Sequence, residues 1–342
     1  MNILSIARAS TLCACCIPIL GAAAAQPPGG HSIGAPAAGA SAVATAEAAA
    51  QQTLQDMAGD DVCSSTAFLA GYASFLGLQE DLQLATSNCI NLTGPGASEA
   101  CQADAMTAFN DGFAEIVAEF QARKDICALL GGGPYDPVID PQNFTQPKPN
   151  PLFPFEVGDS WTYNEQTDEG LQVNVVTITD QTKLIDGVVC RAVHDTVALD
   201  GAIIEDTFDY FAEDNDGTVW YFGEISEEFQ DVAIPNFDGS FISGIDGAKP
   251  GIIMLAAPTV DTTYRQEYLV NEAEDVATVV SLDEHAHVPF GNFKHCLETA
   301  EFSALDPGIT EYKFYAPGIG VVLENDPAEG TQVVLMDFTP GK

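Results

Sequence analysis

The chain has 342 residues, with 11 Lys and Arg against 50 Asp and Glu, which gives a formal net charge of −39 at neutral pH. A surface this acidic repels nucleic acid and anionic lipid, so the composition excludes both as partners. The length suits one large domain or two ordinary ones.

Residues 1–25 match a secretory signal peptide. Arg8 is their single charge, and an apolar stretch over residues 9–20 is followed by small residues up to Ala25. The apolar stretch is too short to cross a bilayer, and no later segment looks transmembrane. We therefore expect cleavage near Ala25 and a secreted or periplasmic protein. Leu12-Cys13-Ala14-Cys15 loosely resembles a lipobox, which leaves a lipid-anchored protein as a minor alternative.

Residues 26–45 are rich in Pro, Gly, Ala and Ser, a composition typical of a flexible leader. Within them, Gly30-His31-Ser32-Ile33-Gly34 matches the nucleophile-elbow pattern G-x-S-x-G. That pattern works at a junction between a strand and a helix, and no strand is expected before these residues. We therefore expect no serine hydrolase site here.

Residues 46–133 are expected to be helical. One apolar stripe recurs at helical spacing and consists of Phe109, Phe113, Ile116, Val117 and Phe120. This helix should begin near Ser98 and end at the glycines from Gly131. An earlier helix should cover residues 62–78.

Six cysteines follow the signal peptide: Cys63, Cys89, Cys101, Cys127, Cys190 and Cys296. An even number in an exported chain predicts disulfides. Cys63 and Cys89 are 26 residues apart in the sequence, and Cys101 and Cys127 are also 26 residues apart. Antiparallel helices joined by a Cys89–Cys101 bridge would bring Cys63 beside Cys127, so we predict both bridges. A Cys190–Cys296 bridge would remain for the β domain, with two buried free thiols as the alternative.

Residues 134–156 form a proline-rich linker, and residues 157–342 show short β segments divided by turn signals. The expected strands are Trp161–Gln166, Leu171–Thr179, Val188–Leu199, Ile203–Ala212, Thr218–Glu224, Thr262–Val270, Val276–Leu282, Phe293–Phe302, Glu311–Tyr315 and Gln332–Phe338. Short connections indicate antiparallel neighbours. The predicted fold class is α+β: a small disulfide-stapled helical region, then a curved antiparallel β-sheet, half-barrel or sandwich.

Two stretches of the β domain carry candidate metal ligands. Asp214-Asn215-Asp216-Gly217 suggests a calcium loop, but the EF-hand register fails and a hairpin turn is favoured. His285-Ala286-His287 would point both imidazoles to one side of a strand and could hold a weak divalent cation. If Val288 opposes Phe293, then His295 points away from the pair. No other cofactor is expected.

The scarce basic residues Arg265 and Lys313 lie inside expected strands. Arg265 shares a face with Glu267, and Lys313 shares one with Glu311, so cross-strand ion pairing is the simpler interpretation. The functional interpretation is the lining of a ligand cavity. Its candidate residues are Tyr264, Arg265, Gln266, Glu267, Tyr268, Lys313, Tyr315 and Trp220.

Residues 150–324 resemble a family of uncharacterised exported bacterial proteins. The matching segments are Asn150-Pro151-Leu152-Phe153-Pro154, Val157-Gly158-Asp159-Ser160-Trp161, Val219–Glu224, Asp246–Gly251, Tyr264–Tyr268 and Tyr315–Gly318. The resemblance implies an exported β domain after a cysteine-containing helical region. It implies no activity.

Three functions stay open. The first is an exported, non-catalytic binding or structural protein, with a small apolar ligand or an envelope component as its partner. The second is a divalent-metal-binding protein that uses His285 and His287. The third is a hydrolase whose site the sequence does not show. The sequence offers no phosphate loop, Rossmann glycine pattern or zinc CxxC pair, so it favours a protein that is not an enzyme.

Overall fold

The computed structural model describes residues 45, 47–55, 59–229 and 235–341. The predicted signal peptide and the G-x-S-x-G pattern lie outside these residues. A helical segment at residues 47–55 precedes two long helices, α2 (Val62–Cys89) and α3 (Ala97–Leu130). Within the described residues, no helix combines the length and the apolar character that a membrane span requires.

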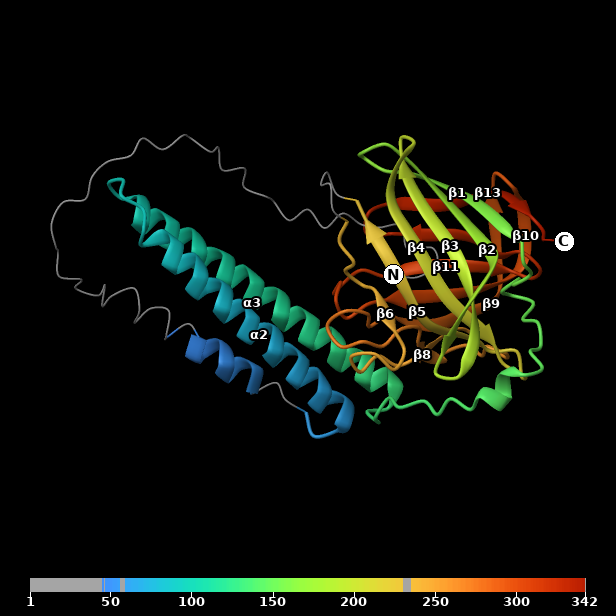
Figure 1. Ribbon diagram of the computed structural model, residues 1–342, viewed down its shortest axis with the longest axis horizontal. Helices are drawn as coiled ribbons and strands as arrows, with labels where there is room; N and C mark the ends of the chain where they lie inside the picture. The colour runs from blue at the N-terminus through green and yellow to red at the C-terminus, as the bar shows by residue number, and fades with distance from the viewer. Residues whose placement is uncertain (1–44, 46, 56–58, 230–234, 342) are drawn as a thin grey trace.

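The helices α2 and α3 form an antiparallel hairpin that projects from the sheet (Figure 1). α2 begins after Asp61, whose side chain accepts a hydrogen bond from the backbone N–H of Ser64. α3 ends at Gly131, where a φ of 82° favours glycine. Phe75 and Phe109 pack between the two helices.

Two disulfides close the hairpin at both ends, as the matched cysteine spacing predicts. Cys63–Cys127 joins the start of α2 to the end of α3, with the Cα atoms 5.6 Å apart. Cys89–Cys101 joins the end of α2 to the start of α3, with the Cα atoms 5.4 Å apart. Both predicted pairings are confirmed.

Thirteen strands follow in one open antiparallel sheet. They are β1 (Ser160–Gln166), β2 (Leu171–Ile185), β3 (Val188–Leu199), β4 (Ala202–Glu213), β5 (Val219–Glu228), β6 (Phe241–Ile242), β7 (Gly251–Met254), β8 (Thr263–Arg265), β9 (Val276–Val288), β10 (Gly291–Phe302), β11 (Glu311–Ala316), β12 (Gly320–Asp326) and β13 (Thr331–Thr339). Their spatial order is β6-β5-β4-β3-β2-β1-β13-β12-β11-β10-β9-β8, and β7 pairs with β5 off this path. The first and last strands therefore lie side by side.

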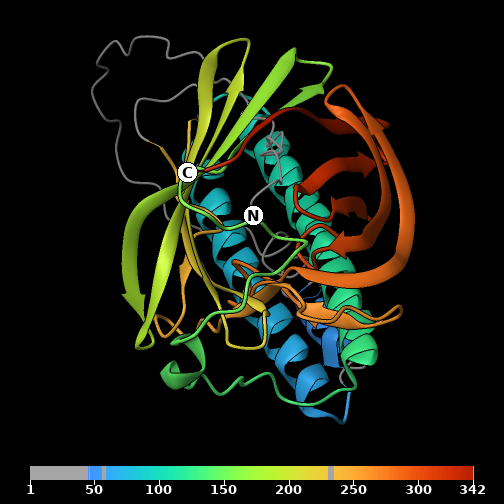
Figure 2. The same ribbon diagram turned by 90° about the vertical axis from the view of Figure 1, so that its right-hand side faces the viewer.

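The sheet curves around its own interior, with β3–β5 on one side and β9–β12 on the other (Figure 2). Trp161, Val176, Phe211 and Leu297 come from four different strands and belong to one buried apolar cluster in this interior. The α+β fold class predicted from the sequence is confirmed, and the sheet is open and antiparallel.

The linker covers a second cluster on the outer face of the sheet. A short 3-10 helix, η1 (Pro141–Phe144), places the Phe144 ring 5.7 Å from that of Phe222, and Cys190 is buried in the same cluster. Cys296 belongs to the interior cluster instead. The predicted Cys190–Cys296 bridge is therefore wrong, and both residues are buried free thiols. Five strands separate β3 from β10, which is about 29 Å along the sheet.

Candidate functional site

The interior face of the sheet changes from apolar to polar along its strands. On β4, Phe211, Asp209, Thr207 and Glu205 occupy alternate positions and are all buried. Because alternate side chains share a face, all four point to the interior. The same change occurs on β1, β2, β5, β10, β11 and β12, and the strand pairing brings the polar positions to one end of the sheet.

We call this polar part the acidic half of the interior face. It consists of Glu165, Gln172, Asn174, Asp195, Glu205, Thr207, Asp209, Glu224, Ser226, Thr299, Glu301, Lys313, Glu324 and Asp326, all buried. Carboxyl groups dominate the set, and Lys313 is its one basic residue. Burial raises the pKa of Asp195, and the neighbouring carboxylates Asp209 and Glu205 raise it further.

Asp209 and Glu224 share one hydroxyl group. The Tyr221 hydroxyl lies 2.6 Å from Asp209 Oδ1 and 2.9 Å from Glu224 Oε2. Burial raises the pKa of Asp209 to about 7 and that of Glu224 to about 8. A tyrosine hydroxyl donates one proton, so a second proton on one of the two carboxyl groups completes this arrangement.

Lys313 neutralises another part of the acidic half. Its Nζ lies 3.0 Å from Glu301 Oε2 and 3.3 Å from Glu324 Oε2, and its side chain is only 2% exposed. Burial opposes ionisation of Glu301, but Lys313 and the hydrogen bond from Thr299 outweigh it and lower the pKa of Glu301. The cross-strand ion pairing predicted for Lys313 is confirmed, with partners on both neighbouring strands.

Four buried oxygen atoms on β2 and β4 accept no hydrogen bond in the described part of the chain. They are Gln172 Oε1, Asn174 Oδ1, Glu205 Oε2 and Asp209 Oδ2. They come from β2 and β4, which flank Asp195 on β3, and the Asn174 amide donates to the Asp195 carboxylate. All four atoms are acceptors, so the group that would satisfy them must bring donors.

A pocket of about 530 Å³ lies at the same end of the sheet. Glu165, Gln172 and Glu324 line it, together with the turns that follow β1 and β12. This volume falls within the range of about 300–1,000 Å³ that is usual for small-molecule sites. Of the four residues with unpaired acceptors, Gln172 lines this pocket, and the other three lie deeper along β2 and β4.

The cavity residues predicted from the sequence fall in separate places. Lys313 bonds Glu301, and the Tyr315 hydroxyl donates to Glu301 Oε1 at 3.0 Å. Gln266 also hydrogen-bonds Glu301. The buried Tyr264 hydroxyl has no hydrogen-bond partner in the described structure. Glu267 is fully buried.

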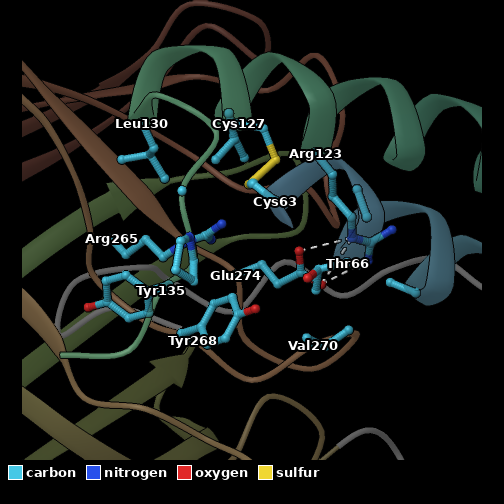
Figure 3. Close-up of a pocket in the computed structure, with 15 residues that line it drawn as sticks. Cys63, Thr66, Arg123, Cys127, Leu130, Tyr135, Arg265, Tyr268, Val270 and Glu274 are labelled. Atoms are coloured by element: carbon cyan, nitrogen blue, oxygen red, sulfur yellow. Dashed lines mark hydrogen bonds and ion pairs between the residues drawn. A yellow bond between two sulfur atoms is a disulfide. The ribbon is translucent and has the colours of Figure 1, made fainter. Parts of the chain in front are cut away.

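Arg265 and Tyr268 line a different cavity, at the base of the helical hairpin (Figure 3). The cross-strand ion pairing predicted for Arg265 is wrong, because Arg265 forms no ion pair within the described residues. β8 ends at Arg265, so the alternation that placed Arg265 and Glu267 on one face stops there. The Arg265 guanidinium lies instead over the rings of Tyr268 and Tyr135, at 4.7 and 5.6 Å from their centroids.

Trp220 lies on the outer face, away from the acidic half. Its Nε1 donates to Asp214 Oδ2 at 3.0 Å, and its ring packs against Phe144. Asp214 Oδ1 also accepts from three backbone N–H groups of its own turn. The hairpin turn favoured over a calcium loop is therefore confirmed.

His285 and His287 are exposed neighbours on β9. Ala286 pairs with Phe293 and not with His295, so the predicted register is wrong by two residues. A bulge at His295, where φ is 58°, then shifts the pairing by one residue, so that Cys296 pairs with Glu284. No group of three or more His, Cys, Asp or Glu within the described residues could hold a metal ion. The histidine metal site stays a prediction.

The sequence interpretation missed Asp195, Glu205, Asp209, Arg123 and Glu274. An available signal was the row of acidic and hydroxyl side chains at alternate positions of β4, which by itself suggests a solvent-facing side. Arg123 and Glu274 are 151 residues apart and carry no local pattern.

A scan against family models and a search of curated proteins found no match. Among solved structures, the chain is similar to a candidate lipoprotein from Parabacteroides distasonis ATCC 8503, at 13% identity and a TM-score of 0.32. The match covers 56% of this chain and all of that one. The resemblance to a family of exported proteins thus stays an expectation.

Proposed function

We propose that the protein is an exported, non-catalytic binding protein that takes a small organic cation in the acidic half of the interior face. The observation that carries this proposal is the group of four buried, unpaired acceptor atoms beside Asp195. A ligand with ammonium N–H groups would satisfy them and would offset the repulsion among the carboxylates.

The ligand class follows from the two halves of the interior. The acidic half supplies negative charge and hydrogen-bond acceptors, and the adjoining cluster around Trp161 and Val176 supplies apolar contact. An amine with a short hydrocarbon chain matches both. Export is supported by the two disulfides, which form in oxidising compartments.

Calorimetry of the purified protein at pH 8.5 tests the proposal. We expect 1,5-diaminopentane to bind and the neutral 1,5-pentanediol to bind at least about tenfold more weakly. Ca²⁺ and Zn²⁺ serve as metal probes, because the alternative through His285 and His287 predicts that a metal ion binds and the diamine does not. Equal binding of the diamine and the diol would contradict the proposal.

A matched pair of variants locates the site on β4. Glu205→Gln removes one carboxylate from the acidic half and should weaken diamine binding about tenfold. Asp206→Asn removes a carboxylate from the opposite face of the same strand, where Asp206 is 40% exposed beside His194, and should change binding less than about twofold. Equal effects of the two variants would argue for nonspecific attraction to the acidic surface.

The hydrolase alternative has no specific support. Within the described residues, no hydrogen bond joins a serine or cysteine side chain to a histidine. It stays a prediction from the sequence.

A further inference from the structure

A second cavity, of about 140 Å³, lies where the hairpin meets the sheet. We call it the junction pocket. Its walls come from the base of α2 and α3, from the linker at Tyr135, and from the segment between Arg265 and Glu274 (Figure 3). It is distinct from the acidic half. The unpaired polar atoms in the acidic half are acceptors, whereas those in the junction pocket are donors on Arg265.

Arg265 is the unusual group in this pocket. Its side chain is only 7% exposed, and its Nε and Nη1 atoms have no hydrogen-bond partner in the described structure. The rings of Tyr135 and Tyr268 hold the guanidinium, but the Tyr135 hydroxyl donates to the carbonyl of Pro250. Aromatic faces replace only part of the hydration that a buried cation loses.

The nearest carboxylate is already engaged. Both oxygens of Glu274 accept from Arg123 at 2.9–3.1 Å, and the backbone N–H of Asn271 also donates to Glu274. Arg123 bonds Glu119 and the Asn271 side chain as well. Arg123 thus occupies both oxygens of Glu274, and within the described residues no carboxylate hydrogen-bonds to Nε or Nη1 of Arg265.

The remaining walls are apolar and define the body of a ligand. Ala70, Ile126 and Leu130 line the pocket beside the Cys63–Cys127 disulfide. A dry cavity of about 150 Å³ holds a benzene molecule, so a single small ring or a short chain fits this volume. One unpaired positive charge selects a monoanion over a phosphate dianion.

We propose that the junction pocket binds a small monocarboxylate, with its carboxylate on the Arg265 guanidinium and its apolar body between α2, α3 and Tyr135. The site is independent of the proposed amine site and would stand if that proposal failed. In a chain with 11 basic residues, one guanidinium is held unpaired beside a cavity whose size and lining suit such a ligand.

Calorimetry of the whole protein with benzoate tests this site without any substitution. We expect benzoate to bind and its neutral analogue benzamide to bind at least about tenfold more weakly. Butyrate tests whether a short chain replaces the ring. No heat from benzoate or butyrate at about 10 mM, or equal binding of benzoate and benzamide, would overturn the proposal.

Two variants and a control test whether benzoate binds in the junction pocket. Arg265→Gln should weaken benzoate at least about tenfold, and Ala70→Leu should block it by filling the cavity while the charge remains. Lys249→Gln removes an exposed positive charge that pairs with Asp136 outside the pocket, and it should leave affinity within about twofold. Benzoate binding that survives both pocket variants, with circular dichroism showing the fold intact, would place it elsewhere and refute the assignment.

Discussion

At the scale of single residues, the charge and the stability of the acidic half depend on the protonation of its buried carboxyl groups. Asp209 and Glu224 lie on either side of the Tyr221 hydroxyl, and burial moves the pKa of both into the neutral range. A carboxyl group with a raised pKa contributes its full stability at acid pH and loses that contribution as the pH rises through the raised value. The interior should therefore become less stable, and more attractive to a cation, as the pH rises from about 4 to about 8.

Asp209→Asn separates this effect from the global charge. The asparagine still accepts from Tyr221 but cannot ionise, so the melting temperature of the variant should fall less than that of the wild type between about pH 4 and pH 7. The difference between the two proteins should grow by several degrees across that range, since about 1.4 kcal/mol accompanies each unit of pKa shift. Thermal melts measure it. Asp337→Asn on the exposed end of β13 should run parallel to the wild type, and a parallel Asp209→Asn curve would contradict the assignment.

Lys313 should stabilise the acidic half, because it is the buried cation between Glu301 and Glu324. Lys313→Met leaves Glu301 and Glu324 facing each other without a cation, and removal of one partner from a buried ion pair costs about 3–5 kcal/mol. Urea unfolding should show this loss. Adding Glu324→Gln should restore part of it, and Lys294→Met at an exposed position should change little. A loss below about 1 kcal/mol would mean that the pair contributes no more than a surface salt bridge.

At the scale of elements, the hairpin was the most predictable part. The equal 26-residue separations correctly indicated two antiparallel helices and both bridges. The start predicted for α3 near Ser98 lies within about one residue of the observed start at Ala97. α2 continues to Cys89, beyond the predicted end at residue 78. Its last turns carry mostly polar residues that face solvent, so no apolar stripe marked this part of the helix in the sequence.

The two disulfides should differ in what they contribute. The Cys63–Cys127 bridge closes a separation of 64 residues and the Cys89–Cys101 bridge one of 12. In the chain-entropy model these are worth about 4 and about 3 kcal/mol. Replacing both cysteines of the first bridge by serine should therefore destabilise the protein more than the same change in the second, as chemical unfolding would report. Equal losses, or a larger loss at the second bridge, would contradict this ranking. Non-reducing peptide maps should show Cys190 and Cys296 unlinked.

The sheet was predictable in outline, and its interior was not. Most strand positions were correct, but β6, β7 and β12 were missed. In β12, Glu324 and Asp326 occupy interior positions where an apolar pattern was expected. The acidic half escaped detection for the same reason: a buried carboxylate at every second position looks like a solvated face. Only the curvature of the sheet, which depends on contacts between distant strands, turns that face inward.

At the scale of the whole molecule, burial removes charges of both signs from the surface, and the surface stays strongly acidic. Among the described residues, three basic and eleven acidic residues are buried, out of 11 and 50 in the sequence. Mutual repulsion of exposed carboxylates opposes the compact state in dilute buffer.

Monovalent salt should therefore stabilise the protein. Raising NaCl toward 1 M shortens the Debye length to about 3 Å and should raise the melting temperature. KCl should act in the same way, because the effect is screening and not specific binding. A melting temperature that stays flat or falls would show that surface repulsion is not a significant cost.

The projecting hairpin has a mechanical consequence. α3 alone has 34 residues and is about 51 Å long, and its contact with the sheet is concentrated near the end that carries Arg123. Such an arm is a lever with its pivot at the junction. A rotation of about 10° there would sweep the turn between α2 and α3 through about 9 Å. Any small rearrangement at the pivot is thereby magnified at the far tip.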